Sequence, residues 1–519
     1  MSLLKNFATV GSATLLSRIL GFVRDILMAG WLGTGPVADA FLVAFRLPNL
    51  FRRLFAEGAF NSAFIPLFAK SLETEGESGA RKFASEILAV FIITLLVVTL
   101  VAELMMPQLI HLLAPGFTDD REKFELAVWL TRITFPYLIC MSVIAFLSGI
   151  LNSFGKFAAA AFTPVLLNVV LISSLALIGW FEKTGTIDAG VWLSWGVFIA
   201  GFVQLASLVI AIKKLGFSVR IQRPRITPAV RRLLVLGVPG VIAGGITQIN
   251  ILIGTIIASF QDGAVSYLYY ADRIYQLPLG IVGIAIGVVL LPELSRQLRT
   301  GSDADVQNSI NRSLEFAMLL TIPASVALVI MPDTILSILF ERGRFTSEDT
   351  TQTANALGAF ALGLPAFVLI KVFSPAYFAR EDTRTPMIFA GVSMFVNVVG
   401  SLILFPYIQH VGIAISTTLA GWVNVALLWW TLSRRGQFLS DGQLRKCLPL
   451  MCLASLCMGA MLWLALPYGQ VWLAHSGLLF RILALGGLVF GGLIVFGSVC
   501  LLTGVIDHRR ITGIVRSKK

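Results

Sequence analysis

Residues 85–106 read SEILAVFIITLLVVTLVAELMM, and this stretch decides the class of fold. Its 22 residues are enough to cross a bilayer as a helix, which takes about 20, and no charge interrupts them between Glu86 and Glu103. Similar stretches recur along the chain, and its charged fraction of 13% is low. A soluble domain has roughly 25% charged residues. The sequence therefore predicts an all-helical integral membrane protein.

Fourteen such stretches are predicted to be transmembrane helices. They cover residues 7–31, 38–66, 85–106, 124–151, 157–180, 187–212, 231–259, 266–294, 313–331, 353–375, 386–405, 411–432, 447–466 and 478–502. Several are longer than a bilayer requires, so these helices must tilt, kink or protrude. Arg18, Arg24 and Asp25 interrupt the first stretch, which is therefore predicted to be a membrane span and not a cleavable signal peptide.

The basic residues alternate from loop to loop. One set of loops, together with the two termini, holds 26 Lys and Arg, whereas the opposite set holds six. The positive-inside rule places the first set in the cytoplasm, and with it both termini, which requires an even number of spans. The net charge of +12 thus reflects membrane topology, and no nucleic-acid partner is expected.

Motifs for catalysis or metal binding do not occur in the sequence. There is no GxxxxGK[ST] phosphate loop, the five cysteines form no CxxC pair, and the four histidines form no HExxH. The sequence therefore predicts a protein that is not an enzyme, with no catalytic residue, no metal and no cofactor, while an enzyme that acts on a lipid stays open as an alternative. Coupling of its activity to an ion or to the membrane potential stays open.

A weak internal repeat divides the chain. Matching positions keep a nearly constant offset: Pro66 and Pro292 (292 − 66 = 226), Pro136 and Pro365 (365 − 136 = 229), and Asn168 and Asn397 (397 − 168 = 229). The repeat predicts two six-helix lobes, 1–212 and 213–432, with the last two spans in 433–519. Because six is even, the lobes have the same orientation, as in transporters with a central site between parallel repeats.

Charged residues inside the first, second and eighth spans are the candidate functional residues. The four arginines predicted to line a central cavity are Arg18, Arg24, Arg52 and Arg273. The polar or charged residues predicted to support them are Asp25, Asp39, Asn49, Arg53 and Glu57. A charge at the centre of a membrane helix costs about 2.5–3.5 kcal/mol, so such residues usually have a function.

The excess of arginine indicates the kind of ligand. A guanidinium keeps its charge and binds phosphate oxygens in a bidentate way, so an anionic substrate is predicted. A structural alternative stays open for Arg53 and Glu57, which are four residues apart and could form a simple helix pair. Arg132 lies near a span end and is expected to extend its charge towards the membrane surface.

The motifs of the first two spans resemble those of a known family. They read GFVRD at 21–25, ADAF at 38–41 and RLPNLFRRLFAEGAF at 46–60, and YADR at 270–273 agrees with them. With the fourteen-span layout, these motifs resemble the MurJ/MviN lipid II flippases over essentially the full length. That family belongs to the multidrug/oligosaccharidyl-lipid/polysaccharide exporter superfamily.

The resemblance implies a substrate and a role for the site. Lipid II, the undecaprenyl-pyrophosphate-linked disaccharide-pentapeptide, would cross from the cytoplasmic to the outer face of the inner membrane for peptidoglycan synthesis, by alternating access. The four arginines would meet its pyrophosphate, and the last two spans would accommodate its lipid tail. Partners would be lipid II, membrane lipids and enzymes of peptidoglycan synthesis. Some relatives carry an acid where this chain has Gln276.

Other functions stay open at the level of sequence. One is a flippase for another polyprenyl-pyrophosphate-linked glycan, and another is a non-transporting scaffold of the cell-wall machinery. A cation-coupled drug exporter is disfavoured by the excess of arginine and by the two extra spans.

Overall fold

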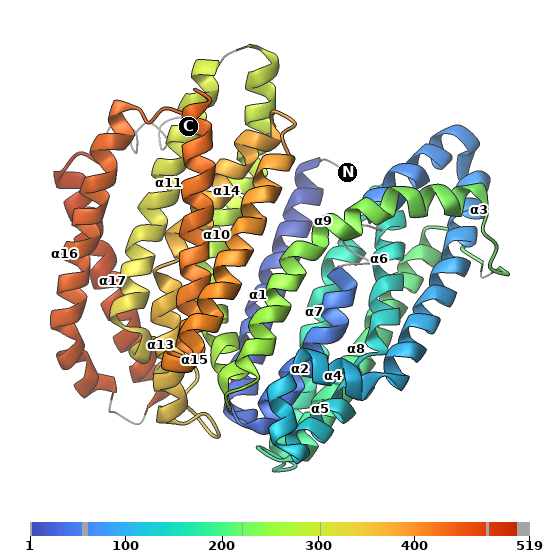
Figure 1. The fold of residues 1–519 in the computed structure, drawn as a ribbon, viewed down its shortest axis with the longest axis horizontal. Helices are drawn as coiled ribbons and strands as arrows, with labels where there is room; N and C mark the ends of the chain where they lie inside the picture. Colours follow the sequence, from blue (N-terminus) through green and yellow to red (C-terminus); the bar gives the residue numbers. More distant parts are fainter. Residues whose placement is uncertain (1–2, 54–60, 221, 302, 474–476, 506–519) are drawn as a thin grey trace. The chain divides into compact units, whose positions relative to one another are not determined.

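The computed structural model describes residues 3–53, 61–220, 222–301, 303–473 and 477–505. Every regular element within these ranges is helical, which confirms the predicted all-helical class (Figure 1). Taken across their kinks, nine helices of the described ranges are long and apolar enough to span a membrane. The total of fourteen spans stays a prediction.

The chain divides into two compact units. The N-terminal unit comprises Met1–Ser266 together with Arg342–Thr346, and the C-terminal unit comprises Tyr267–Glu341 and Ser347–Lys519.

The helices of the N-terminal unit follow the predicted spans with two changes. They are α1 (Leu3–Leu32), α2 (Pro36–Phe51), α3 (Asn61–Leu104), α4 (Met106–Leu113), the 3-10 helix η2 (Pro115–Asp119), α5 (Arg121–Thr134), α6 (Tyr137–Ser153), α7 (Phe157–Trp180), α8 (Ile187–Lys214) and α9 (Pro228–Ala258). The end of the second predicted span and most of the third lie on α3, which ends at Leu104 and kinks at Gly76, where φ is +69°. The fourth predicted span is two helices, because the chain turns before Pro136.

Aromatic side chains form the core at one end of this unit. The rings of Phe64 and Phe146 lie 4.8 Å apart and those of Phe64 and Phe68 lie 5.5 Å apart, all three fully buried. Such aromatic contacts stabilise packing beyond the apolar area that they bury. They join α3 to α6 within the N-terminal repeat.

The C-terminal unit contains eight further helices among the described residues. They are α10 (Ala264–Arg299, whose first turn belongs to the N-terminal unit), α11 (Asp303–Ile330), α12 (Pro332–Leu339), α13 (Ser347–Ala361), α14 (Leu364–Phe378), α15 (Arg384–Arg434), α16 (Gly442–Leu473) and α17 (Leu478–Leu502). The tenth predicted span is two helices that part before Leu364. The eleventh and twelfth are the two halves of α15, which kinks at Ile408 and Gln409.

An ion pair joins the segment just before α15 to the residue that caps its C-terminal end. Asp382 accepts hydrogen bonds from Arg435 Nη1 at 2.7 Å and from the Thr385 amide at 3.0 Å. The Arg435 hydrogen bond, with that from Thr385, lowers the pKa of Asp382 from its ordinary 3.8 to about 2. Its contribution to stability is therefore complete above the ordinary pKa and is lost only as the pH falls through about 2.

Two hydrogen bonds, each from a short segment to the end of a helix, reflect the offset found in the sequence. The Gly116 amide donates to the Ser259 hydroxyl at the end of α9, at 3.0 Å. The Arg344 amide donates to the Gly30 carbonyl near the end of α1, at 2.8 Å. The two acceptor positions differ by 259 − 30 = 229, so each segment rests on the equivalent end of an equivalent helix.

We expect Gly343→Ala to destabilise the N-terminal unit more than a matched glycine substitution. Gly343 has φ +58°, and a Cβ there would lie 2.3 Å from the Gly30 carbonyl oxygen. Gly216 also has a positive φ, +77°, but nothing lies within 4 Å of its Cβ position. Gly216→Ala should lower the free energy of unfolding by about 1–2 kcal/mol through backbone strain. Gly343→Ala should lower it clearly more, because its Cβ also meets the Gly30 carbonyl oxygen. Thermal unfolding in detergent compares the stability of the two variants, and an equal loss of stability in both would contradict the expectation.

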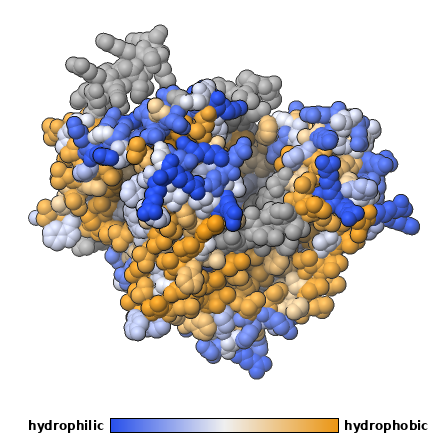
Figure 2. All heavy atoms as spheres, turned by 45° about the horizontal axis from the view of Figure 1, so that its top comes forward, coloured by the Kyte–Doolittle hydropathy of each residue, from blue (hydrophilic) through white to orange (hydrophobic). Residues whose placement is uncertain are grey.

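The surface is that of a multi-pass membrane protein. Hydrophobic side chains cover much of the visible face, and hydrophilic side chains gather in its upper part and along its lower edge (Figure 2). Trp463 of α16 and Leu483 and Phe490 of α17 are more than 60% exposed. In water such side chains would form an unusually large apolar patch, whereas in a bilayer they contact lipid.

Candidate functional site

Arg24 is held in place by neighbours on α1 and α7. It is 9% exposed, and its Nε and Nη2 donate to Asp25 Oδ1 at 3.0 and 2.7 Å. Its Nη1 donates to Asn168 Oδ1 at 3.1 Å. Asn168 in turn donates to the Ser17 carbonyl of α1 at 2.9 Å. The guanidinium is thus oriented by a carboxylate and an amide in an apolar bundle, where charge-assisted hydrogen bonds are strong.

The sequence pointed to Asn168 only as a repeat marker, yet it has a direct structural role. Its amide lies against Gly21, where a Cβ would be 3.5 Å from Asn168 Nδ2. The small residue lets α7 approach α1 closely enough for Asn168 to reach both Arg24 and Ser17. An asparagine inside an apolar helix is the signal in the sequence that could have identified it.

Arg52 and Arg24 both act electrostatically on one hydroxyl group. Arg52 caps the end of α2, and the charges of both arginines act on the phenol of Tyr137 at the start of α6. Tyr137 is 1% exposed and shares a 3.1 Å hydrogen bond with Gln204 of α8. Both of these predicted cationic residues belong to the N-terminal unit. Arg18, on the same helix as Arg24, is exposed on α1.

Asp39 forms a second buried centre, with a lysine as its partner. Lys123 Nζ lies 2.9 Å from Asp39 Oδ2 and 2.9 Å from Asp262 Oδ1, and Asp39 and Lys123 are 0% and 2% exposed. Asp39 also accepts from the amides of Gly263 and Ser266, at 2.9 and 3.0 Å. It therefore caps the N-terminus of α10, where a negative charge is favourable.

Lys123 was missed by the sequence analysis, which counted it among the loop charges. Asp120 begins α5 by accepting hydrogen bonds from the amides of Glu122 and Lys123, so Lys123 occupies the first turn of the helix. There it points to Asp39, 84 positions earlier in the chain. This distant, buried carboxylate compensates the charge of the buried ammonium.

Arg273 belongs to the C-terminal unit. Its guanidinium carbon lies 4.6 Å from the centre of the Tyr269 ring, and its Nη2 donates to the Tyr269 hydroxyl at 3.2 Å. One residue earlier, Asp272 accepts a hydrogen bond from Gln276. That Arg273 shares a cavity with the other three arginines stays a prediction.

The remaining predicted residues are placed as follows. Asn49 donates to the Phe45 carbonyl of its own helix at 2.7 Å, and Arg53 is exposed at the end of α2. Glu57 lies outside the described residues, so its pairing with Arg53 also stays a prediction. Arg46 donates to the Thr255 hydroxyl of α9. Within the described ranges, no group of three His, Cys, Asp or Glu side chains could hold a metal ion.

Comparison with known proteins identifies the family. The family model described as lipid II flippase MurJ matches residues 28–483. A probable lipid II flippase MurJ from Rhizobium meliloti (strain 1021) is 52% identical over 510 residues, which cover 97% of this chain and 94% of that protein. The lipid II flippase MurJ of Burkholderia cenocepacia is 33% identical over 474 residues, covering 90% and 91%.

Solved structures agree with this match. A lipid II flippase MurJ in an inward closed conformation superposes with a TM-score of 0.79 at 28% identity and covers 97% of this chain and 99% of that one. An inward-facing multidrug resistance transporter of the MATE family superposes with a TM-score of 0.66 at 14% identity, over 83% and 98%, and shares the fold alone. The resemblance found in the sequence motifs is therefore confirmed, and the chain belongs to the MurJ lipid II flippase family.

Proposed function

We propose that this protein carries lipid II from the cytoplasmic to the outer face of the inner membrane by alternating access. The observation that supports this most strongly is Arg24, a buried arginine of the N-terminal unit that Asp25 and Asn168 orient. Arg52 of the same unit acts electrostatically on Tyr137. Transport makes and breaks no covalent bond, so these residues act as ligands for the substrate and not as catalysts.

The pyrophosphate of lipid II is the group that these arginines would bind. Moving such an anion into an apolar bundle costs much free energy unless cations compensate it. Arg24 already makes charge-assisted hydrogen bonds with Asp25, so the substrate would exchange one anionic partner for another. In the empty site, Asp25 compensates the buried charge of Arg24, and in the loaded site the pyrophosphate would do so. Arg18, Arg52 and Arg273 would supply further positive charge.

The membrane arrangement is part of the proposal. Both termini would be cytoplasmic, with fourteen spans, the lobes 1–212 and 213–432 around the central cavity, and 433–519 beside the prenyl tail. The long rows of exposed apolar side chains on α16 and α17, such as Leu456 (65% exposed) and Ile494 (58% exposed), support a position beside a lipid tail.

The test is replacement of the lipid II flippase in a strain depleted of its own. We expect the wild type to restore growth and the appearance of lipid II on the outer face. A variant with Arg18, Arg24, Arg52 and Arg273 all changed to Ala should do neither at equal membrane levels. Arg121→Ala is the matched control, because its side chain is 90% exposed and its ion pair with Glu125 is at the surface. Rescue by the quadruple variant would favour a non-transporting scaffold, and failure of the wild type would favour another polyprenyl-linked glycan.

A further inference from the structure

The segment Arg342–Thr346, which we call the strap, comes from the predicted C-terminal repeat but packs as part of the N-terminal unit. Both of its flanks belong to the C-terminal unit. There Thr350 donates a hydrogen bond to Glu341 Oε2 at 2.9 Å, which joins the two flanks. The ring of Phe340 also lies 5.3 Å from that of Tyr270. The strap is therefore a loop with its base fixed in one unit and its tip in the other.

The tip of the strap lies directly on the backbone at the end of α1. The Arg344 amide donates to the Gly30 carbonyl at 2.8 Å. A Cβ on Gly33, whose φ is +70°, would lie 2.7 Å from the Arg344 carbonyl oxygen. A Cβ on Gly30 would lie 3.1 Å from Arg342 Cγ. Glycine permits this close approach of two backbones, and Phe345, 1% exposed, shows that the tip is packed.

The Arg344 side chain adds a second contact, with the turn between α7 and α8. Its Nη2 donates to the Thr184 carbonyl at 3.2 Å, and a Cβ on Gly185 would lie 2.5 Å from its Nε. The Gly185 amide in turn donates to the Trp31 carbonyl of α1 at 2.8 Å. The strap, the end of α1 and this turn therefore form one joint, and two of its three parts belong to the N-terminal repeat.

An equivalent contact runs in the opposite direction between the repeats. A Cβ on Gly116 would lie 2.3 Å from the carbonyl oxygen of Ser259, at the end of α9. Gly116 and Gly343 differ by 343 − 116 = 227 positions, which agrees with the offset of the repeat. Each repeat thus places a short segment on the end of the other repeat's first helix, so the two contacts are crossed.

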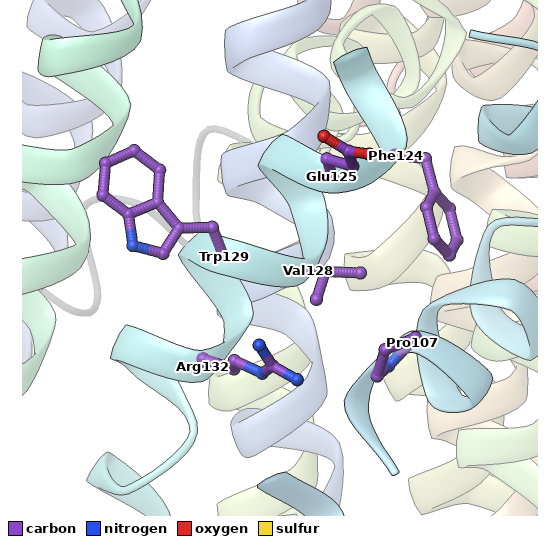
Figure 3. Close-up of a pocket in the computed structure, with 6 residues that line it drawn as sticks. All are labelled: Pro107, Phe124, Glu125, Val128, Trp129 and Arg132. Atoms are coloured by element: carbon purple, nitrogen blue, oxygen red, sulfur yellow. The ribbon is translucent and has the colours of Figure 1, made fainter. Parts of the chain in front are cut away.

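The helices that flank Gly116 leave space between them. In Figure 3, Phe124 and Val128 of α5 point towards Pro107 of α4, and these residues line a pocket of about 360 Å³. Closely packed helices resist displacement, whereas a void of this size lets α4 shift against α5 without a steric clash. The contact at Gly116 can therefore open without repacking of a dense core.

The position of the crossed contacts indicates what they control. In the proposed orientation α1 ends at the outer face, and α9 is the equivalent helix of the second repeat. Release of a substrate to the outside by alternating access separates the repeats at this end. We propose that the strap is a latch, which keeps the outer side closed while it is bound to Gly30 and Thr184 and detaches from α1 before lipid II is released. The inference rests on the proposed function.

A disulfide between the strap and α1 tests whether this contact opens. Because Arg342 Cγ lies 3.1 Å from a Cβ on Gly30, the sulfurs of Gly30→Cys/Arg342→Cys can form an S–S bond of about 2.05 Å. In spheroplasts of the flippase-depleted strain, we expect the appearance of lipid II on the outer face to fall in proportion to the cross-linked fraction, measured by mass spectrometry. Dithiothreitol should restore it. Gly30→Cys alone and Arg342→Cys alone are the matched controls and should transport under both conditions.

The outcomes separate the latch from the proposed function. Transport by the fully cross-linked variant would overturn the latch and leave the flippase activity standing. Absence of the cross-link under oxidising conditions would also overturn it, because the strap would then not rest on α1. Failure of the wild type to transport lipid II would contradict the proposed function, and a measurement without transport then decides on the latch.

Hydrogen exchange of the purified protein in detergent is that measurement. The Arg344 amide is protected by its hydrogen bond to Gly30, so its exchange reports detachment of the strap. Arg344→Ala keeps this amide but loses the contact with Thr184. We expect its exchange to be about two- to tenfold faster after correction for the intrinsic rate, the scale of one hydrogen bond. Arg121→Ala should leave the rate unchanged. An unprotected Arg344 amide in the wild type, or no acceleration in Arg344→Ala, would overturn the latch.

Discussion

Replacing Arg24 by alanine is expected to abolish the transport of lipid II and to destabilise the protein as well. The guanidinium is a buried positive charge and is preorganised by Asn168. Its loss also leaves Asp25, which is 2% exposed, without its arginine. Breaking a buried ion pair by removing one partner costs about 3–5 kcal/mol.

A double variant separates these two effects. In Arg24→Ala/Asp25→Asn the buried carboxylate is gone, so most of the stability should return. Transport should stay absent, because the pyrophosphate still lacks its ligand. Asp25→Asn alone, which keeps the guanidinium and its hydrogen bond to Asn168, should retain part of the activity.

Thermal unfolding in detergent measures the stability of these variants. Rescue of a flippase-depleted strain, with each variant at the same membrane level, measures their transport. Transport by the double variant would show that Arg24 serves only to neutralise Asp25. In that case the arginine pair would not support the proposed function.

Local features of the sequence were sufficient for the helical class and for several elements. The predicted spans 157–180 and 478–502 have the same bounds as α7 and α17. Hydropathy is a property of each segment, so it identifies apolar helices without knowledge of the fold. It does not show where a turn interrupts an apolar segment, and so the fourth and tenth spans, each of which is two helices, were predicted as single helices.

The candidate site was predictable only in part, for a physical reason. A charge in an apolar segment is visible in the sequence, which is how Arg24 and Asp39 were found. The partner that makes such a charge favourable can be far away in the chain: Asn168 is 144 positions from Arg24, and Lys123 is 84 positions from Asp39. These pairs arise from tertiary packing, which no local pattern encodes.

The Asp39–Lys123 pair yields the second large effect. We expect Asp39→Asn to lower the free energy of unfolding by about 3–5 kcal/mol, because the remaining carboxylate beside the buried Lys123 would be that of Asp262, whose side chain is 89% exposed. Asp39→Ala should cost about 1 kcal/mol more, since it also removes the cap of α10. Glu125→Gln is the control: it breaks an exposed pair, which should contribute at most about 1 kcal/mol.

The double variant Asp39→Asn/Lys123→Met gives the decisive comparison. A buried ion pair replaced by uncharged groups of similar volume is often nearly neutral for stability, and the introduced asparagine could still accept a hydrogen bond at the start of α10. We therefore expect the double variant to recover most of the loss in thermal unfolding. If it is no more stable than Asp39→Asn, the loss comes from the hydrogen bonds to Gly263 and Ser266 and not from the charge of Lys123. Recovery would show that these two buried charges are present for a reason other than stability, since an uncharged pair could then hold the same helices together.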